Sequence, residues 1–279
     1  MLGGLKRALV ACLAPLDVTV LRASELEAMQ RAMHERGREL QELQRQLRDS
    51  ADREFVRALP SAQRARVAAL LRESRSQIRQ DLFVLSELDF KRDGYFVEFG
   101  AASGIGDSNT YLLERDFAWR GILAEPAKFW HDGLKANRSA SISTQCVWRE
   151  SNRTLLFNEV ELAGLSTIDA FSGADSWHEQ RKKGHSYEVQ TISLMDLLEQ
   201  FAAPPAIDYL SIDTEGSELE ILKAFDFGRY RIAVITCEHN FTPARAEIRA
   251  LLARNGYVRK YEALSRFDDW YVLAGSRSA

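Results

Sequence analysis

The sequence predicts an α/β protein with a doubly wound, mostly parallel sheet, preceded by an N-terminal helical extension. From residue 94 onward, short apolar runs of β-prone residues alternate with helical segments. A glycine-rich turn follows the first of these runs. Upstream, residues 22–80 contain no glycine except Gly37 and neither tryptophan nor tyrosine. Alternation of strands and helices is typical of a parallel sheet with helices on both faces.

Composition narrows the class of protein. The 279 residues are 46% hydrophobic and 28% charged, which excludes a disordered chain, a collagen-like repeat and a disulfide scaffold. With 37 Lys+Arg against 40 Asp+Glu, the net charge of -3 gives no basic field for nucleic acid. Cys12, Cys146 and Cys237 form no CxxC pair, so we expect reduced thiols and a cytoplasmic location. No run of about 18 apolar residues is present, so we expect no transmembrane segment.

The first 21 residues faintly resemble a signal peptide, because two early charges precede an apolar run. Pro15 and Asp17 interrupt that run, and no convincing small-residue cleavage site follows. We therefore expect a short docking helix and a linker at 1–21.

Residues 22–79 form a helical segment with its own charge pattern. They hold 13 arginines, no lysine and 9 acids. A heptad-like stripe runs along it, with Arg36 at one seam position; its apolar members are Leu26, Met29, Met33, Leu40, Leu43 and Leu47. Pro60 should end the first helix, and Ser61 could cap a second. Two interpretations stay open: a coiled coil joining copies of the chain, or a helix packed on its own globular domain.

Seven strands and four helices are predicted after the helical segment. Five strands are expected at 95–99, 121–125, 142–147, 207–213 and 232–238. Helices are expected at 107–117, 126–138, 217–225 and 243–254. Asn255-Gly256 is a stop signal for the last helix, and a final pair of strands follows at 257–263 and 270–274. We expect two regions: a helical extension at 1–76, and a Rossmann-like domain at 77–279.

The alternation breaks between residues 149 and 189. This stretch contains Trp177, Tyr187 and the basic cluster Arg181-Lys182-Lys183. A long excursion from a compact sheet is often functional. We interpret it as an insertion that acts as a substrate lid, whose basic cluster would suit a negatively charged sugar; a plain surface hairpin is the alternative.

The candidate site lies at the carboxyl ends of the strands, where doubly wound sheets bind ligands. The first strand ends with Glu98 and Phe99, and Gly100 and Gly104 follow it. Asn109 stands at the position where a dinucleotide-binding fingerprint needs its third glycine. A nicotinamide-dependent dehydrogenase is therefore excluded. A carboxylate at Glu98 would repel a pyrophosphate and suits a ligand with positive charge. S-adenosylmethionine, with a sulfonium and an α-ammonium, is such a ligand.

A second acid supports a nucleoside ligand. Glu125 ends the second strand, 25 residues after Gly100. A carboxylate at this position can accept both hydroxyls of a ribose. It could equally balance the dipole of the helix that begins at Pro126, and one residue can do both.

These motifs resemble the FkbM family of S-adenosylmethionine-dependent methyltransferases, within the class I Rossmann-like superfamily. The resemblance covers roughly residues 77–275. It rests on GYFVEFGAASGIGDSNTYLLE (94–114), WRGILAEP (119–126), Asn137-Arg138, IDYLSIDTEGSELEIL (207–222), EHN (238–240) and NGY (255–257). It implies a seven-stranded sheet whose last strand is inserted antiparallel. It also implies methyl transfer to oxygen, with a sugar, glycan or natural product as the small-molecule acceptor.

The resemblance assigns cofactor contacts to residues at the strand ends. Glu98 and Gly100 would lie against the methionine part, Glu125 would hold the ribose, and Cys146 with Val147 would border the adenine. Asp213 would lie beside the reacting centre, and Gln80 with Asp81 would close over the cofactor. The remaining expected contacts are Ala101, Ser103, Asn109 and Pro126.

Two constellations could activate a hydroxyl acceptor. In one, His239 takes the proton while Asp213 or Glu215 orients it. In the other, Asp213, Glu215 and Glu238 bind Mg²⁺, which acidifies the hydroxyl. A third reading, from another class, is a non-catalytic nucleoside-binding scaffold that recruits partners through its N-terminal helix.

Overall fold

The computed structural model describes residues 23–160, 163–173 and 178–275, so the expected docking helix at 1–21 and Trp177 lie outside the described residues. The chain divides into two compact units, Met1–Glu54 and Phe55–Ala279. This division falls earlier than residue 76, where composition placed it. The reason is packing: Phe55, Leu59 and Val67 are buried in one apolar cluster with Leu82.

The first unit is described from Ala23 onward by helix α2 (Ala23–Ala58), which continues into the second unit. Its six stripe residues are exposed, Met33 by 64% and Leu26 by 45%. Association of this helix with a second copy stays a prediction. The helix ends before Pro60, and α3 (Ser61–Leu70) follows. The expectation that Ser61 caps α3 is wrong, because Pro60 occupies the N-cap position and no side chain caps the helix.

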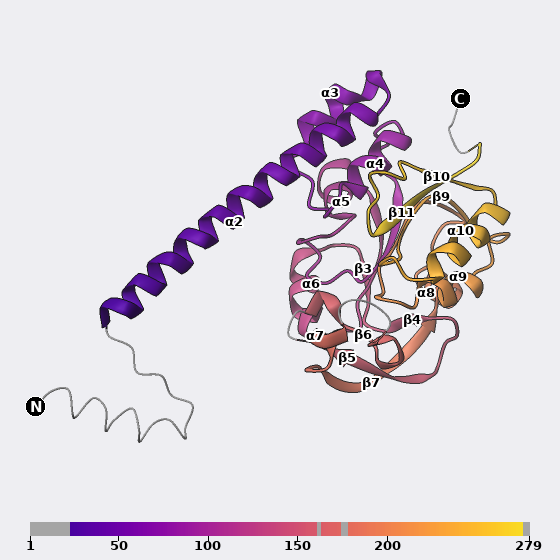
Figure 1. Ribbon diagram of the computed structural model, residues 1–279. Helices are drawn as coiled ribbons and strands as arrows, with labels where there is room; N and C mark the ends of the chain where they lie inside the picture. The colour runs from indigo at the N-terminus through magenta and orange to yellow at the C-terminus, as the bar shows by residue number, and fades with distance from the viewer. Residues whose placement is uncertain (1–22, 161–162, 174–177, 276–279) are drawn as a thin grey trace, which may run out of the picture. The chain divides into compact units, whose positions relative to one another are not determined.

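The second unit is built around a seven-stranded sheet (Figure 1). Its strands, in spatial order, are β10 (Tyr257–Lys260), β11 (Asp268–Leu273), β9 (Arg231–Glu238), β8 (Ala206–Ile212), β1 (Tyr95–Phe99), β2 (Arg120–Ala124) and β3 (Ser141–Ser143). The five strands from β9 to β3 are parallel. β11 is antiparallel to both of its neighbours. The doubly wound sheet with an inserted antiparallel last strand is thus confirmed.

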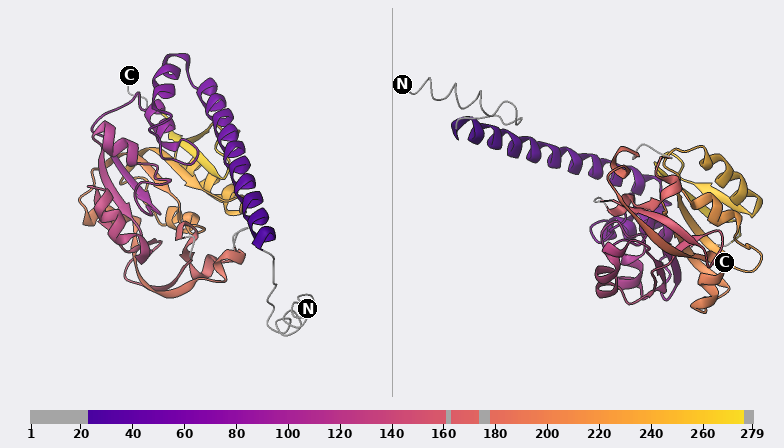
Figure 2. Two further views of the ribbon diagram at one scale, coloured as in Figure 1. Left: turned by 90° about the vertical axis from the view of Figure 1, so that its left-hand side faces the viewer. Right: turned by 90° about the horizontal axis from the view of Figure 1, so that it is seen from below.

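Helices cover both faces of this sheet, as the views of Figures 1 and 2 show. One face packs against α8 (Leu194–Gln200), α9 (Glu218–Lys223) and α10 (Ala244–Arg254). The other packs against α3, α4 (Gln80–Glu87), α5 (Tyr111–Phe117) and α6 (His131–Asn137). Successive strand residues serve opposite faces: Phe96 belongs to the second cluster, and Val97 to the first.

The chain between β3 and α8 forms a second, smaller sheet. The run at 142–147, expected as one strand, is split between β3 and β4 (Cys146–Trp148), which belong to different sheets. The smaller sheet has the order β4, β7 (His185–Ser193), β5 (Thr154–Glu159), β6 (Thr167–Ile168). Short helices lie between its strands along the chain: η3 (Ala163–Leu165), η4 (Asp169–Phe171) and α7 (His178–Arg181). The insertion is therefore an ordered sheet in its described parts, built on β4.

None of the helices among the described residues is long and apolar enough to span a membrane.

Candidate functional site

A pocket that is partly open to solvent lies between the carboxyl ends of the main strands and the smaller sheet. Its main-sheet wall is formed by Gly100, Ala102, Glu125, Pro126, Asp213, Thr214, Glu215 and Ser217. Its other wall contains Cys146, Val147, Phe157, Gly164, Ser166 and Ile168. The lining of this cavity combines apolar side chains with a few polar groups, as small-molecule sites do.

Glu125 is held in a fixed orientation at one end of the cavity. Its Oε2 accepts the backbone N–H of Ala102 at 2.7 Å, and its Oε1 accepts that of Ala127 at 2.8 Å. Burial raises the pKa of Glu125 to about 7. A carboxylate offers about four acceptor positions, so two remain for a ligand. Two acceptor positions on one carboxylate match the two adjacent hydroxyls of a ribose.

The first turn must be glycine because two strand ends meet there. Gly100 has a φ of +70°, and a Cβ at this position would collide with the backbone carbonyl of Asp213. The close approach of β1 and β8 brings the turn and Asp213 to the same stretch of cavity wall. Asp213 is therefore within the cavity and next to the first turn.

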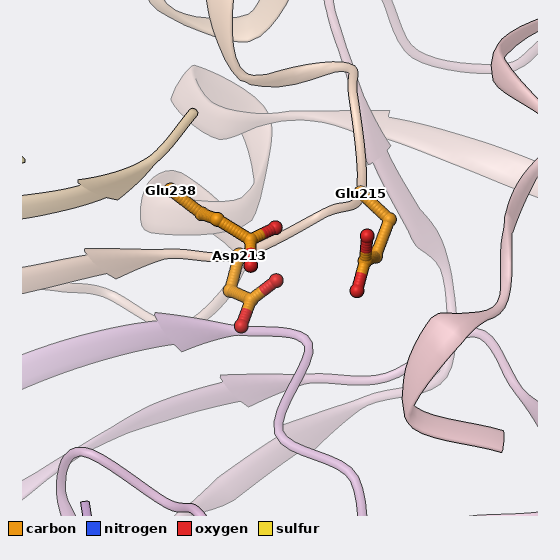
Figure 3. A group of neighbouring side chains, drawn as sticks. All are labelled: Asp213, Glu215 and Glu238. Carbon is orange, nitrogen blue, oxygen red and sulfur yellow. The ribbon is translucent and has the colours of Figure 1, made fainter. Parts of the chain in front are cut away.

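Three carboxylates meet beside this point (Figure 3). Oxygens of Asp213, Glu215 and Glu238 lie within 4.8 Å of one another. The side chains of Asp213 and Glu238 point toward one another, and that of Glu215 faces the same space. Burial is the main cause that raises the pKa of Asp213 to about 7. Burial and then the charge of Asp213 raise the pKa of Glu238 well above its usual range.

The smaller sheet contributes the positive charge nearest to these acids. Arg181 is 1% exposed, and its guanidinium lies 2.7 Å from Oε2 of Glu215. Thr167 donates to the backbone oxygen of Glu215 at 2.8 Å. The hypothesis that the basic cluster meets an acidic sugar is thus wrong for Arg181, which is buried and paired. Lys182, which directly follows α7, pairs with Glu179 of that helix.

Comparison with known proteins places the chain in a family. Residues 98–259, more than half of the chain, match the family model described as the methyltransferase FkbM domain. The chain belongs to the FkbM family of S-adenosylmethionine-dependent methyltransferases. The comparison with curated proteins gives no match. Gln80 and Asp81 lie outside the matched residues of this FkbM domain.

Several solved structures are similar at low identity. A precorrin-6Y C5,15-methyltransferase from Geobacter metallireducens GS-15 is 13% identical, with 69% of this chain and 85% of that chain covered and a TM-score of 0.36. A human methyltransferase 10 domain containing protein is 14% identical, with 76% and 96% covered and a TM-score of 0.35. The N-terminal domain of human METTL16, in complex with SAH, is 12% identical, with 64% and 60% covered and a TM-score of 0.30. The strand order of this FkbM domain itself defines its fold.

Glu98 does not line the cavity of the FkbM domain, and its contact with the methionine part of the cofactor stays a prediction. It accepts hydrogen bonds from the side chains of Ser108 and Thr110 and from the backbone N–H of Asn109. The guanidinium of Arg138 lies 3.8 Å away. The physical reason is strand alternation: Phe99 faces the cavity, so Glu98 faces the opposite side of the sheet. Its positive partner is a side chain of the protein.

Asn109 is also internal, against expectation. Its amide donates to the hydroxyl of Ser211 at 3.0 Å. Ser103 accepts weakly from the N–H of Ile105 and Gly106 at 3.4 Å and does not line the cavity. Ala101 is buried beneath the turn, and its neighbour Ala102 takes the cavity-facing position. These residues shape the loop that follows β1.

Gln80 and Asp81 begin α4 and are buried away from the cavity. The Gln80 amide donates to Asp268 at 3.1 Å, and Asp81 accepts the hydroxyl of Ser74 at 2.7 Å. Burial raises the pKa of Asp81 to about 6. The helix α4 packs on the second face of the sheet, and the closing of these two residues over the cofactor stays a prediction.

His239 is oriented by a different acid than expected. Its Nε2 lies 3.6 Å from Asp269, and its Nδ1 accepts the backbone N–H of Phe241 at 3.0 Å. His239 directly follows Glu238 at the end of β9, and consecutive side chains of a strand point to opposite faces. Glu238 therefore joins Asp213, whereas His239 pairs with β11.

The cavity-lining residues that sequence reasoning missed come mainly from the smaller sheet. Phe157, Gly164, Ser166 and Ile168 line the wall opposite the strand ends. No motif marks them, because they reach the cavity only through the pairing of β5 with β6 and β7. Ala102 and Thr214, in contrast, are direct neighbours of predicted positions.

Proposed function

We propose that this chain transfers the methyl group of S-adenosylmethionine to a hydroxyl of a sugar, glycan or natural product. One observation supports this most: a single cavity connects Glu125, which has two acceptor positions to spare, with Asp213 in the carboxylate cluster. A ribose-binding acid and a base-competent acid at opposite parts of one pocket are what methyl transfer to oxygen needs.

The cavity residues fit the parts of the cofactor. Glu125 would accept the two ribose hydroxyls. Cys146 and Val147, together with Phe157 and Ile168, would line the adenine with apolar side chains. Gly100 lets the backbone approach the methionine part without a Cβ in the way. Pro126 fixes the chain direction beyond Glu125.

When bound, the cofactor supplies a methyl group activated by its sulfonium. The protein must then align a hydroxyl in line with the carbon–sulfur bond and remove its proton. Asp213 is proposed to accept that proton while the oxygen–methyl bond forms and the carbon–sulfur bond breaks. Glu238, hydrogen-bonded to Asp213 in its neutral form, would hold the base in place.

A second arrangement of the same site uses Mg²⁺. Asp213, Glu215 and Glu238 supply three carboxylate oxygens, the ligand type that Mg²⁺ prefers. Arg181 already balances part of their charge at Glu215. One measurement distinguishes the two arrangements. If Mg²⁺ is required, turnover falls on chelation with EDTA and returns on addition of Mg²⁺. If Asp213 accepts the proton with Glu238 neutral beside it, turnover is insensitive to both additions.

The test begins with calorimetric titration of the protein with S-adenosylhomocysteine, followed by a screen of hydroxyl acceptors for its release from S-adenosylmethionine. We expect micromolar binding and release that depends on an acceptor. Binding without release for any acceptor, with Asp213→Asn leaving the protein's cellular role intact, would instead identify a nucleoside-binding scaffold.

A further inference from the structure

The turn that follows β9 holds a phenylalanine exposed beside the carboxylate cluster. Phe241 is 70% exposed. It and Asn240 both have positive φ, +58° and +42°. Bulky residues rarely adopt this conformation, and two in succession require the surroundings to impose it. Residues 239–242 are called the aromatic turn below.

Several hydrogen bonds impose this conformation. The backbone N–H groups of His239 and Asn240 both donate to the carbonyl of Phe267, at 2.9 and 3.1 Å. The N–H of Phe241 donates to the His239 ring at 3.0 Å, and the two rings meet edge to face at 5.3 Å. The hydroxyl of Thr242 donates to the carbonyl of His239. The aromatic turn is therefore rigid, and the exposed ring has a fixed place.

The same turn is bonded to the carboxylate cluster. The amide of Asn240 donates to Oε2 of Glu215 at 3.1 Å, beside Arg181. Phe241 follows Glu238 by three residues, so their Cα atoms are separated by at most about 11 Å. Phe241 thus lies on the same turn as Asn240, which is bonded to the cluster.

The aromatic turn also lies on the side from which an acceptor must approach. Displacement in line requires the attacking oxygen to lie opposite the leaving sulfur. Asp213 and Glu215 line the cavity, whereas Glu238, Asn240 and Phe241 are not among its described lining residues. Glu238 belongs to the cluster itself, and Asn240 is bonded to the cluster at Glu215. The cofactor would occupy one side of Asp213, which leaves the side of the aromatic turn for the acceptor.

From this arrangement, which rests on the function proposed above, we propose that the aromatic turn is the acceptor subsite and that it binds an uncharged pyranose ring. An aromatic face carries partial negative charge and attracts the weakly positive C–H face of a sugar ring. The carboxylates beside it accept sugar hydroxyls. Three acids against one arginine disfavour an anionic sugar. His239 then acts as a positioning residue that supports Phe241.

The experiment measures binding of methyl glycosides to the protein saturated with S-adenosylhomocysteine, by saturation-transfer NMR. The probes are methyl glycosides of neutral hexoses and the corresponding uronic acids. We expect millimolar binding of a neutral glycoside, at least tenfold weaker binding of its uronate, and loss of affinity of about tenfold in Phe241→Ala. Phe241→Trp should keep the affinity, because a larger aromatic face remains.

Val258→Ala is the matched control, since Val258 is 51% exposed on β10 and should leave glycoside binding unchanged. Equal affinity in Phe241→Ala and wild type, preference for uronates, or no glycoside binding to the loaded wild type would each overturn the subsite. Calorimetry with S-adenosylhomocysteine separates this failure from failure of the proposed function: Phe241→Ala should bind it as wild type does, and absence of binding in wild type itself would contradict the methyltransferase proposal.

Discussion

Two groups of buried acids lie at the carboxyl end of this sheet, and they differ in what surrounds them. Glu98 is enclosed by three hydrogen-bond donors and Arg138, and it is not among the residues that line the cavity. Asp213 and Glu238 face one another beside a cavity, and their nearest arginine is bonded to Glu215. The contrast teaches that an acid at a strand end becomes chemical or structural according to its counter-charges and its access to a ligand.

The strongest test of this contrast is Asp213→Asn. We expect methyl transfer to fall by about 10² to 10⁴-fold, since Asn cannot take a proton from the acceptor. Affinity for S-adenosylhomocysteine and thermal stability should stay near wild type, because Asn is nearly the same size as Asp and its amide oxygen can still accept the hydrogen bond from neutral Glu238. Methyl transfer is measured as release of S-adenosylhomocysteine with an acceptor from the screen. Affinity and thermal stability are measured by titration and scanning calorimetry. Glu188→Gln, an exposed acid on β7, is the control; turnover equal to wild type in Asp213→Asn would contradict the chemical role.

Glu98→Ala should have the opposite profile. The change leaves buried donors on Ser108, Asn109 and Thr110 without their acceptor. We expect the free energy of unfolding to fall by about 3 kcal/mol or more. Urea unfolding measures this, and the folded fraction should still bind S-adenosylhomocysteine. A stable variant that no longer binds the cofactor would show instead that Glu98 contacts it.

Asp81 extends the comparison to a buried acid with a partly satisfied carboxyl group. Its folded pKa of about 6 exceeds the usual 3.8, so the folded protein binds the extra proton more tightly than the unfolded chain. Stability from this group is present below pH 4 and is lost as the pH rises through 6. The loss relative to Asp81→Asn should approach about 3 kcal/mol. Urea unfolding of both proteins at pH 4 to 7 measures the difference; parallel curves would contradict the raised pKa.

The smallest effect is expected at Glu125. In the protein without a ligand, the pKa of Glu125 is about 7. Ribose hydroxyls should bind the charged carboxylate of Glu125 better than the neutral carboxyl group. Affinity for S-adenosylhomocysteine should rise about tenfold between pH 6 and 8. The pKa of Asp213 is also about 7, so Asp213 could cause a similar rise. Calorimetry should find the rise in affinity retained in Asp213→Asn and absent in Glu125→Gln. A rise lost in Asp213→Asn would assign it to the cluster.

Sequence reasoning reached the parts of the site that depend on local pattern. Gly100, Glu125, Pro126, Cys146, Val147 and Asp213 line the cavity as the strand ends suggested. It did not specify the direction of side chains that alternation decides, such as the bonding of Glu98 to Ser108 and the proximity of His239 to Asp269. It also missed the smaller sheet, since the pairing of β4 with β7 joins residues about 45 positions apart and leaves no local signal.

The placement of β11 has a consequence for the order in which the protein folds. β11 pairs with β9 on one side and β10 on the other, and its Asp268 receives the amide of Gln80 from 188 residues upstream. During synthesis the edge of β9 that pairs with β11 therefore stays unpaired until β11 has left the ribosome. Such late, long-range pairing slows folding, and an exposed strand edge invites association between nascent chains. Productive folding of this domain should thus depend on how quickly β11 is synthesised and pairs with β9.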